Sequence, residues 1–284
     1  MSDLYIPATV KLFQTASRSW RFSLAINDRF PHAETTVGKE ILKVENLNAG
    51  RLVRDISFSV MEGEILGIAG LMGAGRTEMT RALFGVDSKE TGRIFLDGKE
   101  IFIQKPSDAI KAGIVLAPED RKKDGLCTKL SVRDNISLPN LDLLSSKFGI
   151  INKKKENEMV LKAVRDFSIK LASPEANAQN LSGGNQQKVV VAKWLSRNSR
   201  VVIFDEPTRG IDVKAKVEIY TIMNHLKKAG IGVVFVSSEL PEILGMSDRI
   251  IVMCDGRITG ELKRENATQK DILVYATQFE KKVG

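Results

Sequence analysis

LSGGNQQ at residues 181–187 and VVIFDE at residues 201–206 are the stretches that decide the fold of this chain. The first is a polar turn with two glycines that opens a helical pattern. A serine hydroxyl, glycine backbone that allows close approach, and the free N–H groups of a helix N-terminus together suit a phosphate group. The second stretch is an apolar strand that ends in two adjacent carboxylates, Asp205 and Glu206. We therefore predict a phosphate-binding turn at the first stretch, and a site for a metal ion and a water molecule at the end of the second.

A second glycine-rich turn, GLMGAGRT at residues 70–77, follows the apolar run EILGIA at 64–69. It has the frame of a P-loop, G-x-x-x-x-G-K-[ST], in which the backbone wraps phosphate oxygens and the last hydroxyl coordinates Mg²⁺. Arg76 stands where lysine is expected, and a guanidinium is bulkier than an ammonium group and binds bidentately. This loop is therefore compatible with nucleotide binding and unfavourable for hydrolysis. The residues predicted to bind nucleotide here are Gly70, Gly73, Ala74, Gly75, Arg76 and Thr77.

The adjacent carboxylates suit the chemistry of a bound nucleotide. Asp205 is placed to hold Mg²⁺ through water, together with Thr77, and Glu206 is placed to orient or deprotonate an attacking water. Each feature also has a purely structural interpretation: a helix-capping serine, a bare glycine turn, or a helix-capping acidic pair. The order and spacing of all three favour the functional interpretation.

The rest of the chain alternates apolar strand patterns with helical ones, which indicates an α/β core. Alternation at 41–47 and 56–60 predicts an antiparallel edge, and Asp97-Gly98 predicts the turn of a hairpin over 92–104. The pattern between 131 and 179 is helical and more polar, with the run Lys153-Lys154-Lys155. The remaining expected strands are 114–117, 201–204 and 231–236, with a strand and hairpin over 246–260; the expected helices are 107–113, 186–197, 213–229 and 268–282.

Composition bounds the class of protein without selecting a partner. The chain has 284 residues, 43% of them hydrophobic, so it can bury a sizeable core. Its net charge of +8 permits a nucleic acid, a nucleotide or a membrane surface as partner. Its two cysteines stand in no ligand spacing, which fits reduced thiols in a cytosolic compartment. No apolar run approaches the roughly 18 residues that span a bilayer, so we expect membrane association to go through a partner.

Five segments, GLMGAGRTE, APEDR, LSGGNQQK, DEPTRGID and SSELPEILGMSDRI, together resemble one family. They are similar to the C-terminal nucleotide-binding half of the ribose-, xylose- and galactose-type importer ATPases, within the ABC-transporter ATPases. The resemblance covers about residues 40–280. It implies a P-loop NTPase core of ABC-ATPase type, an α/β fold with an antiparallel β edge and a helical subdomain at about 131–180. We expect 1–38 to be an irregular N-terminus and linker, and 39–284 to be the nucleotide-binding domain.

The resemblance also assigns roles to individual residues. The signature turn would contact the γ-phosphate of a nucleotide held by the opposite subunit, through Leu181, Ser182, Gly183, Gly184 and Gln186. Three positions depart from the complete family set: Arg76 in the P-loop, Glu119 in place of the Q-loop glutamine, and Ser238 in place of the switch histidine. No aromatic ring stands at 48–52, where the adenine platform is expected. The chain's own P-loop site would thus be degenerate, while its signature completes the partner's site.

The resemblance implies a subunit or half-subunit that couples Mg-ATP binding and hydrolysis to import of a monosaccharide. Its partners would be a second nucleotide-binding half, in cis, in trans or as a homodimer, and transmembrane permease subunits. A periplasmic or extracellular sugar-binding protein would act indirectly. The expected location is the cytoplasmic face of the cell membrane, as a peripheral protein, with no nucleic-acid partner.

Two other functions remain open at this point. One is a non-catalytic regulatory module that binds nucleotide without turnover and shares every site residue. The other is a soluble ABC ATPase that acts on nucleic acid or ribosomes. The run Lys153-Lys154-Lys155 is better explained as a solvated helix face than as a nucleic-acid contact. Thr77 and Ser182 also lie only 105 residues apart, without the heptads of a coiled coil.

Overall fold

The computed structural model describes residues 30–197 and 199–279. The first 29 residues of the segment predicted to be irregular lie outside the described residues. The chain divides into two compact units, one containing Asp120–Ser199 and Gly210–Ile219, the other containing Arg29–Glu119, Arg200–Arg209 and Tyr220–Gly284. We call the first of these the helical unit and the second the nucleotide unit.

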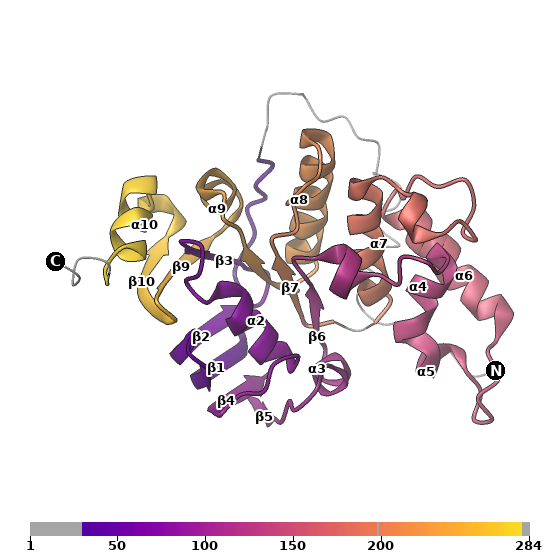
Figure 1. The fold of residues 1–284 in the computed structure, drawn as a ribbon, viewed down its shortest axis with the longest axis horizontal. Coiled ribbons are helices and arrows are strands. Elements are labelled where there is room, and N and C mark those ends of the chain that lie inside the picture. Colours follow the sequence, from indigo (N-terminus) through magenta and orange to yellow (C-terminus); the bar gives the residue numbers. More distant parts are fainter. Residues whose placement is uncertain (1–29, 198, 280–284) are drawn as a thin grey trace. The chain divides into compact units, whose positions relative to one another are not determined.

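The nucleotide unit contains two β-sheets (Figure 1). A six-stranded sheet has the order β10-β9-β3-β8-β7-β6, in which only the β10 and β9 pair is antiparallel. A four-stranded antiparallel sheet has the order β2-β1-β4-β5. The strands are β1 Glu40–Ala49, β2 Val53–Met61, β3 Ile65–Gly70, β4 Thr91–Leu96, β5 Lys99–Ile101, β6 Ile114–Ala117, β7 Val201–Asp205, β8 Gly232–Val236, β9 Arg249–Cys254 and β10 Arg257–Lys263.

Burial explains which apolar runs became central strands. All residues of β6, β7 and β8 are buried, as expected for parallel strands covered on both faces. One core lies between the two sheets and includes alternate residues of the larger sheet, such as Leu66 and Ile68 of β3. It also takes in one face of α2, including Met79 and Leu83. Because β3, β8 and β7 are parallel neighbours, their carboxyl ends lie at one edge of the sheet, and predicted site residues follow each of them.

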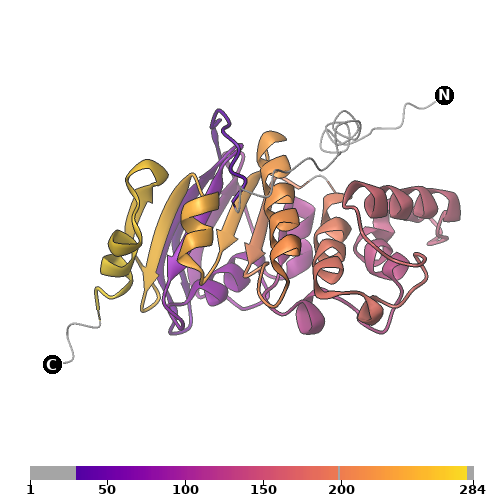
Figure 2. The ribbon, with the colours of Figure 1, turned by 90° about the horizontal axis from the view of Figure 1, so that it is seen from above.

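Within the described residues, four helices belong to the nucleotide unit, together with the second part of α8. In Figure 2, α9 lies over the strands of the larger sheet, which it contacts at β3. The buried residues Tyr220, Met223 and Leu226 belong to the part of α8 in this unit. The helices are α2 Arg76–Phe84, α3 Pro106–Ala112, α9 Leu240–Met246, α10 Gln269–Ala276 and α8 Val213–Lys228.

The helical unit is built around α7, Gly183–Leu195, which contacts both α4 and α6. Apolar side chains on these helices, including Ile136, Val160 and Val190, are fully buried. A π-helical turn, Arg121–Gly125, opens the unit. The other helical elements are α4 Val132–Ser137, η2 Leu138–Asn140, α5 Leu141–Leu144, α6 Lys153–Asp166 and η3 Ala178–Asn180.

Most predicted elements are confirmed, with boundary shifts of a few residues. The Asp97-Gly98 turn joins β4 to β5, and both turn residues have positive φ, 48° and 75°. Helix α9 was missed, because Pro241 interrupts its pattern; proline is tolerated there since it stands in the first turn. None of the described helices is long and apolar enough to cross a membrane.

Residues 30–38 are irregular, as predicted, but they do not form a detached linker. The Asn224 side chain donates a hydrogen bond to the Pro31 carbonyl, and the Lys227 ammonium group donates one to the Ala33 carbonyl at 2.6 Å. His32 Nε2 lies 3.0 Å from Asp248 Oδ1. Buried polar groups of α8 therefore hold these residues on the nucleotide unit, while the assignment of 1–38 as a linker stays a prediction.

Candidate nucleotide-binding site

The predicted P-loop connects β3 to α2 in the nucleotide unit. Gly70, Gly73 and Gly75 have φ of 153°, 81° and 95°, a conformation that glycine adopts without the steric cost of a Cβ atom. A Cβ at Gly73 would meet no atom within 4 Å, so the loop leaves space beside its backbone. The loop then enters α2, whose first N–H groups point back toward it. This is the geometry of an anion cradle.

Arg76, the first residue of α2, is directed into the unit and is 8% exposed. Its Nη1 donates a 2.7 Å hydrogen bond to the Ser237 carbonyl, beyond β8. Its Nη2 lies 3.5 Å from Glu206 Oε1, beyond β7. The guanidinium thus joins the ends of three neighbouring elements. A lysine ammonium, being a single donor group on one stem, cannot reproduce both contacts in this fork geometry.

Asp205 ends β7 and is 1% exposed. Thr77 Oγ1 donates to its Oδ1 at 3.2 Å, and Thr80 Oγ1 donates to its Oδ2 at 3.3 Å. Burial raises the pKa of Asp205 to about 6, with a smaller contribution from Glu206. The hydrogen bonds from both threonines and the charge of Arg76 oppose that rise. A cation at this carboxylate would remove the cost of keeping it ionised in a buried place.

Glu206 has a backbone φ of 47°, an uncommon value for a residue with a side chain. Its N–H donates to the Val236 carbonyl at 3.0 Å, which ties the end of β7 to the end of β8. Ser238 Oγ donates to Glu206 Oε2 at 3.1 Å. Arg76 contacts Oε1 of the Glu206 carboxylate and Ser238 donates to Oε2, so both oxygens have protein partners. The structure thus places Glu206 and Ser238, both predicted site residues, in direct contact.

A third buried carboxylate, Glu242, supports this region and was not singled out from the sequence. It is 1% exposed and lies in α9. Thr208 donates to its Oε2 at 2.7 Å and Ser237 does so at 2.8 Å. It therefore fixes the two loops that follow β7 and β8. Its only sequence signal is an acidic residue in an otherwise apolar helix, which is not specific.

Glu119, predicted to replace the Q-loop glutamine, follows β6. It forms an ion pair with Arg209, in the loop after β7. Its side chain is half-buried.

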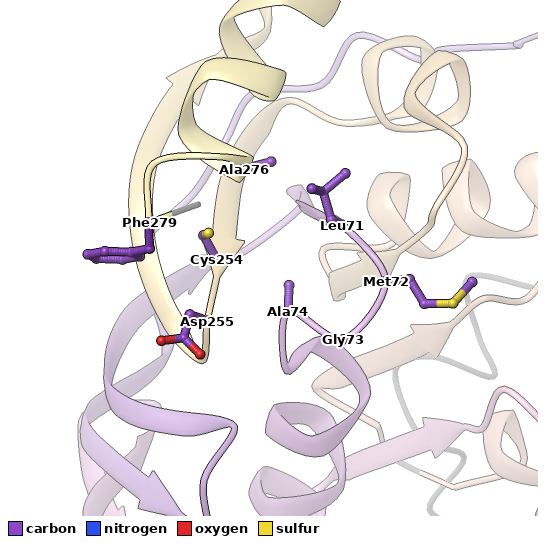
Figure 3. Close-up of a pocket in the computed structure, with 8 residues that line it drawn as sticks. All are labelled: Leu71, Met72, Gly73, Ala74, Cys254, Asp255, Ala276 and Phe279. Carbon is purple, nitrogen blue, oxygen red and sulfur yellow. The ribbon is translucent and has the colours of Figure 1, made fainter. Parts of the chain in front are cut away.

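A cavity of about 290 Å³ lies directly beside the P-loop (Figure 3). The loop residues from Leu71 to Ala74 form one wall, and Cys254 and Asp255 form another. Figure 3 shows Phe279, which follows α10, on the far side of the cavity from Met72. Met72 itself is 95% exposed.

The signature turn belongs to the helical unit. Ser182 is the N-cap of α7, where its Oγ accepts hydrogen bonds from Asn185 N at 3.4 Å and from Asn185 Nδ2 at 3.0 Å. Gln186 is 3% exposed, and its Nε2 donates to the Ala178 carbonyl at 3.1 Å. Gly184 is required by packing, because a Cβ there would lie 2.6 Å from the Cβ of Ala215. Leu181 is half-buried and Ser182 is exposed, so the hydroxyl is accessible from solvent.

Arg121, the first residue of the π-helical turn, was not predicted to belong to this site. Its Nε lies 3.4 Å from Gln186 Oε1, and its Nη2 lies 3.4 Å from the Gly210 carbonyl. A Cβ on Gly183 would be only 2.7 Å from its Nη2. The guanidinium is therefore packed against the signature glycine. Nothing near Arg121 in the sequence indicates this contact, which depends on how α7 folds back on the turn.

A family model described as ABC transporter matches residues 53–209, more than half of the chain. The chain belongs to the ABC transporter family. The matched span includes the P-loop, the signature turn and the carboxylates of Asp205 and Glu206 at the end of β7. Of the five segments that resemble this family, GLMGAGRTE, APEDR and LSGGNQQK lie wholly within the matched span.

Members of the ABC transporter family resemble this chain closely over half their length. The ribose import ATP-binding protein RbsA of Oceanobacillus iheyensis is 52% identical over 252 residues, which cover 89% of this chain and 51% of the relative. The xylose import ATP-binding protein XylG of Thermoanaerobacter pseudethanolicus is 50% identical over 260 residues, again 89% of this chain and 51% of the relative. The chain thus spans about half the length of the curated relatives it matches.

Solved structures of ABC transporter cassettes share the fold. MJ1267, an ATP-binding cassette, has a TM-score of 0.71 and 22% identity, covering 83% of this chain and 98% of that chain. The dimeric cassette MJ0796, bound to ADP and Pi, has a TM-score of 0.67 and 20% identity, covering 79% of this chain and 99% of that chain. The predicted fold class, an α/β ABC-ATPase core, is confirmed.

Proposed function

We propose that this chain is the ATP-binding subunit, or one half of such a subunit, of an ABC importer for a monosaccharide. Its own P-loop site is degenerate, and its signature turn completes the site of a partner half. The observation that carries this proposal is the contact of Arg76 with Glu206 beside the P-loop. Similarity to ribose and xylose import proteins supports the class of cargo.

The contact of Arg76 with Glu206 limits hydrolysis at the chain's own site. A general base must take a proton from water through a carboxylate oxygen, and here a cation and a hydroxyl already occupy both oxygens of Glu206. Ser238 provides that hydroxyl and lacks the imidazole charge that a histidine would bring. We therefore assign Glu206 and Ser238 to the catalytic position of this site and infer that turnover there is slow.

Residues at this site fit Mg-ATP. The P-loop from Gly70 to Arg76 would hold the phosphates. Glu119, two residues after the end of β6, would belong to the same nucleotide-binding set. Thr77 and Asp205 would hold Mg²⁺, because this ion is bound by one or two oxygen ligands from protein and by nucleotide phosphates. When bound, Mg²⁺ would neutralise charge on the β- and γ-phosphates. Without it, Asp205 is a buried carboxylate with a raised pKa.

The signature turn would act on a second nucleotide-binding half. Ser182 and the N–H groups of Gly183 and Gly184 offer donors at the start of α7, where the helix dipole favours an anion. Gln186 is buried and bonded within its own unit, so we assign it to holding the turn in place rather than to touching phosphate. The relatives, of which this chain covers about half, provide a model for such a second half.

The remaining partners follow from the proposed import function. Transmembrane permease subunits would carry the sugar, and an external sugar-binding protein would act indirectly through them. The chain would lie at the cytoplasmic face of the membrane. Residues 39–284 would form the nucleotide-binding domain, with the helical subdomain at about 131–180.

The test is Mg-ATP hydrolysis by the chain alone and by a mixture with a complete N-terminal half of a related importer. We expect low activity alone and high activity in the mixture. Ser182→Ala should abolish the mixture's activity, while Glu206→Gln should change it little. Ser131→Ala is the matched control, since Ser131 caps α4 in the same unit with a similar bond to Asp134 N. Fast turnover by the lone chain, lost in Glu206→Gln, would refute the degenerate site.

A non-catalytic regulatory module is the second candidate, and the same Arg76–Glu206 contact favours it. This module would bind ATP, yet neither the chain nor the mixture would hydrolyse it above the rate of the N-terminal half alone. Measurement of ATP binding beside turnover therefore separates the two functions.

A further inference from the structure

Residues 145–151 form a tight hairpin between α5 and α6 of the helical unit. Ser145 and Ile151 make an antiparallel bridge, and Ser146 N donates to the Ile150 carbonyl at 2.9 Å. The turn is closed by Gly149 N, which donates to the Ser146 carbonyl at 2.9 Å. In Figure 1 this segment extends as a narrow loop beyond the two helices that it joins. Its backbone bonds hold the tip in one shape.

The tip of the hairpin displays large apolar side chains to solvent. Phe148 is 91% exposed and Ile150 is 71% exposed. Leu143, in the helix that leads into the hairpin, is 49% exposed. The burial of these groups in an apolar medium would remove a large area from water without ordering a flexible loop first. Their position on a rigid tip suits shallow insertion.

The same segment carries only positive charge. Residues 145–155 contain Lys147, Lys153, Lys154 and Lys155 and no acidic residue. Lys153 pairs with Glu156 at 3.0 Å, and within the described residues the other three lysines make no ion pair. The apolar tip is thus flanked on both sides by exposed ammonium groups.

These lysines stand where the helix itself disfavours them. Lys153, Lys154 and Lys155 occupy the first turn of α6, after the N-cap Asn152. The positive end of the helix dipole lies there and favours acidic residues, so three cations repel both the dipole and one another. An external anion removes this repulsion. The arrangement breaks a local rule: Glu158 lies one turn from Lys154 and Lys155, but among the described residues of α6 the ion pair with these lysines is that of Lys153 with Glu156.

We propose that the hairpin 145–151 and the lysines at the start of α6 form a contact with an anionic lipid surface. Phe148 and Ile150 would enter the boundary between headgroups and acyl chains, and the lysines would lie at the phosphate level. An interfacial site of this kind needs apolar side chains and basic side chains close together, and this segment has both. The proposal goes beyond membrane association through a partner, and it does not depend on nucleotide binding or hydrolysis.

A protein groove is a different occupant for the same tip. A groove that took Phe148 would need acidic residues placed for lysines on both sides of it, whereas an anionic bilayer presents negative charge on every side of an inserted ring. The exposed lysines that precede and follow Phe148 in the sequence therefore favour the lipid surface. Capture by a permease is the competing outcome of the test.

The test is co-sedimentation of the full chain, without nucleotide, with vesicles of phosphatidylglycerol and phosphatidylcholine, and with vesicles of phosphatidylcholine alone. We expect binding only to the anionic vesicles, weakening as salt is raised. Lys154→Gln with Lys155→Gln should reduce the affinity roughly twenty-fivefold, from about fivefold per lysine near an anionic surface. Phe148→Ala should reduce it roughly tenfold. Fluorescence of Phe148→Trp should shift to the blue on anionic vesicles.

Two control variants are matched to these changes. Phe102→Ala removes another ring, 80% exposed, from the nucleotide unit, and Lys122→Gln with Lys123→Gln removes two exposed charges elsewhere in the helical unit. Both should bind vesicles as the unaltered chain does. Equal effects of the control and hairpin variants, or equal binding to both vesicle types, would overturn the proposal. So would loss of permease capture in the hairpin variants when the unaltered chain binds no vesicles, because the hairpin would then contact protein.

Discussion

Asp205→Asn should stabilise the free protein while it removes a ligand of the proposed Mg²⁺ site. The carboxylate is buried at the end of β7, between the hydroxyls of Thr77 and Thr80. An asparagine has the same shape, and threonine hydroxyls can either donate to its carbonyl or accept from its amide. The substitution therefore removes the charge and preserves the hydrogen bonds.

The size and sign of the effect follow from the pKa of Asp205, which burial raises from 3.8 to about 6. The pKa of Asp205 is higher in the folded than in the unfolded protein, so protonation of Asp205 favours the folded state. The stability of the unaltered protein is therefore unreduced by this group below about pH 4, and it falls as pH rises through 6. A rise of about two units corresponds to about 3 kcal/mol at pH 8, and to under about 1 kcal/mol at pH 4. The amide of the substituted side chain stays neutral at every pH, so the variant should exceed the unaltered protein in stability by these amounts.

The assay is urea unfolding at several pH values between 4 and 8, with a chelator and without nucleotide. Asp97→Asn is a control of opposite sign, because its hydrogen bonds with Arg200 lower the pKa of Asp97. Its contribution is present above the unfolded pKa and lost as pH falls, so this variant should be less stable at pH 8. A difference between Asp205→Asn and the unaltered chain that does not grow with pH would refute the reasoning. ATP binding by Asp205→Asn should also lose its dependence on Mg²⁺.

Two further substitutions test the packing of each unit. Gly184→Ala should destabilise the helical unit by about 1–3 kcal/mol in urea unfolding, since the new Cβ would overlap the Cβ of Ala215. Helix propensity alone predicts a gain in stability of about 1 kcal/mol. A more stable variant would therefore contradict the clash. Lys227→Met should destabilise the nucleotide unit by about 3–5 kcal/mol, because it leaves Asp248 without the ammonium that lies at 2.6 Å. The same change should raise the pKa of His32 in an NMR titration, since burial and Lys227 both lower it; an unchanged His32 pKa would show that the two side chains do not interact in solution.

Sequence patterns were sufficient for the elements whose physics is local. Strands β6, β7 and β8 are short apolar runs, so burial on both faces could be predicted from the residues alone. The P-loop glycines signal a backbone that must take positive φ, and three of them do. The cap of α7 by Ser182 is equally local, because capping needs only the residue and the next turn.

The structure of segments without a helical or strand periodicity could not be predicted from the sequence in this way. Residues 30–38 have the composition of a linker, yet Asn224 and Lys227 of α8 hold them. These partners lie far away in sequence, with separations of 193 and 194 for the two bonds. No local pattern carries such a pairing.

The sequence by itself determined the α/β core, the family and the order of the site residues along the chain. Only the tertiary structure decided what Arg76 does: its partners Ser237 and Glu206 follow two other strands, and adjacent parallel strands bring their carboxyl ends together. The same holds for Glu119 with Arg209, and for Gly183 with Arg121. Periodicity records which face of an element is buried, whereas the partner of a side chain depends on how separate elements pack, and that information is not local.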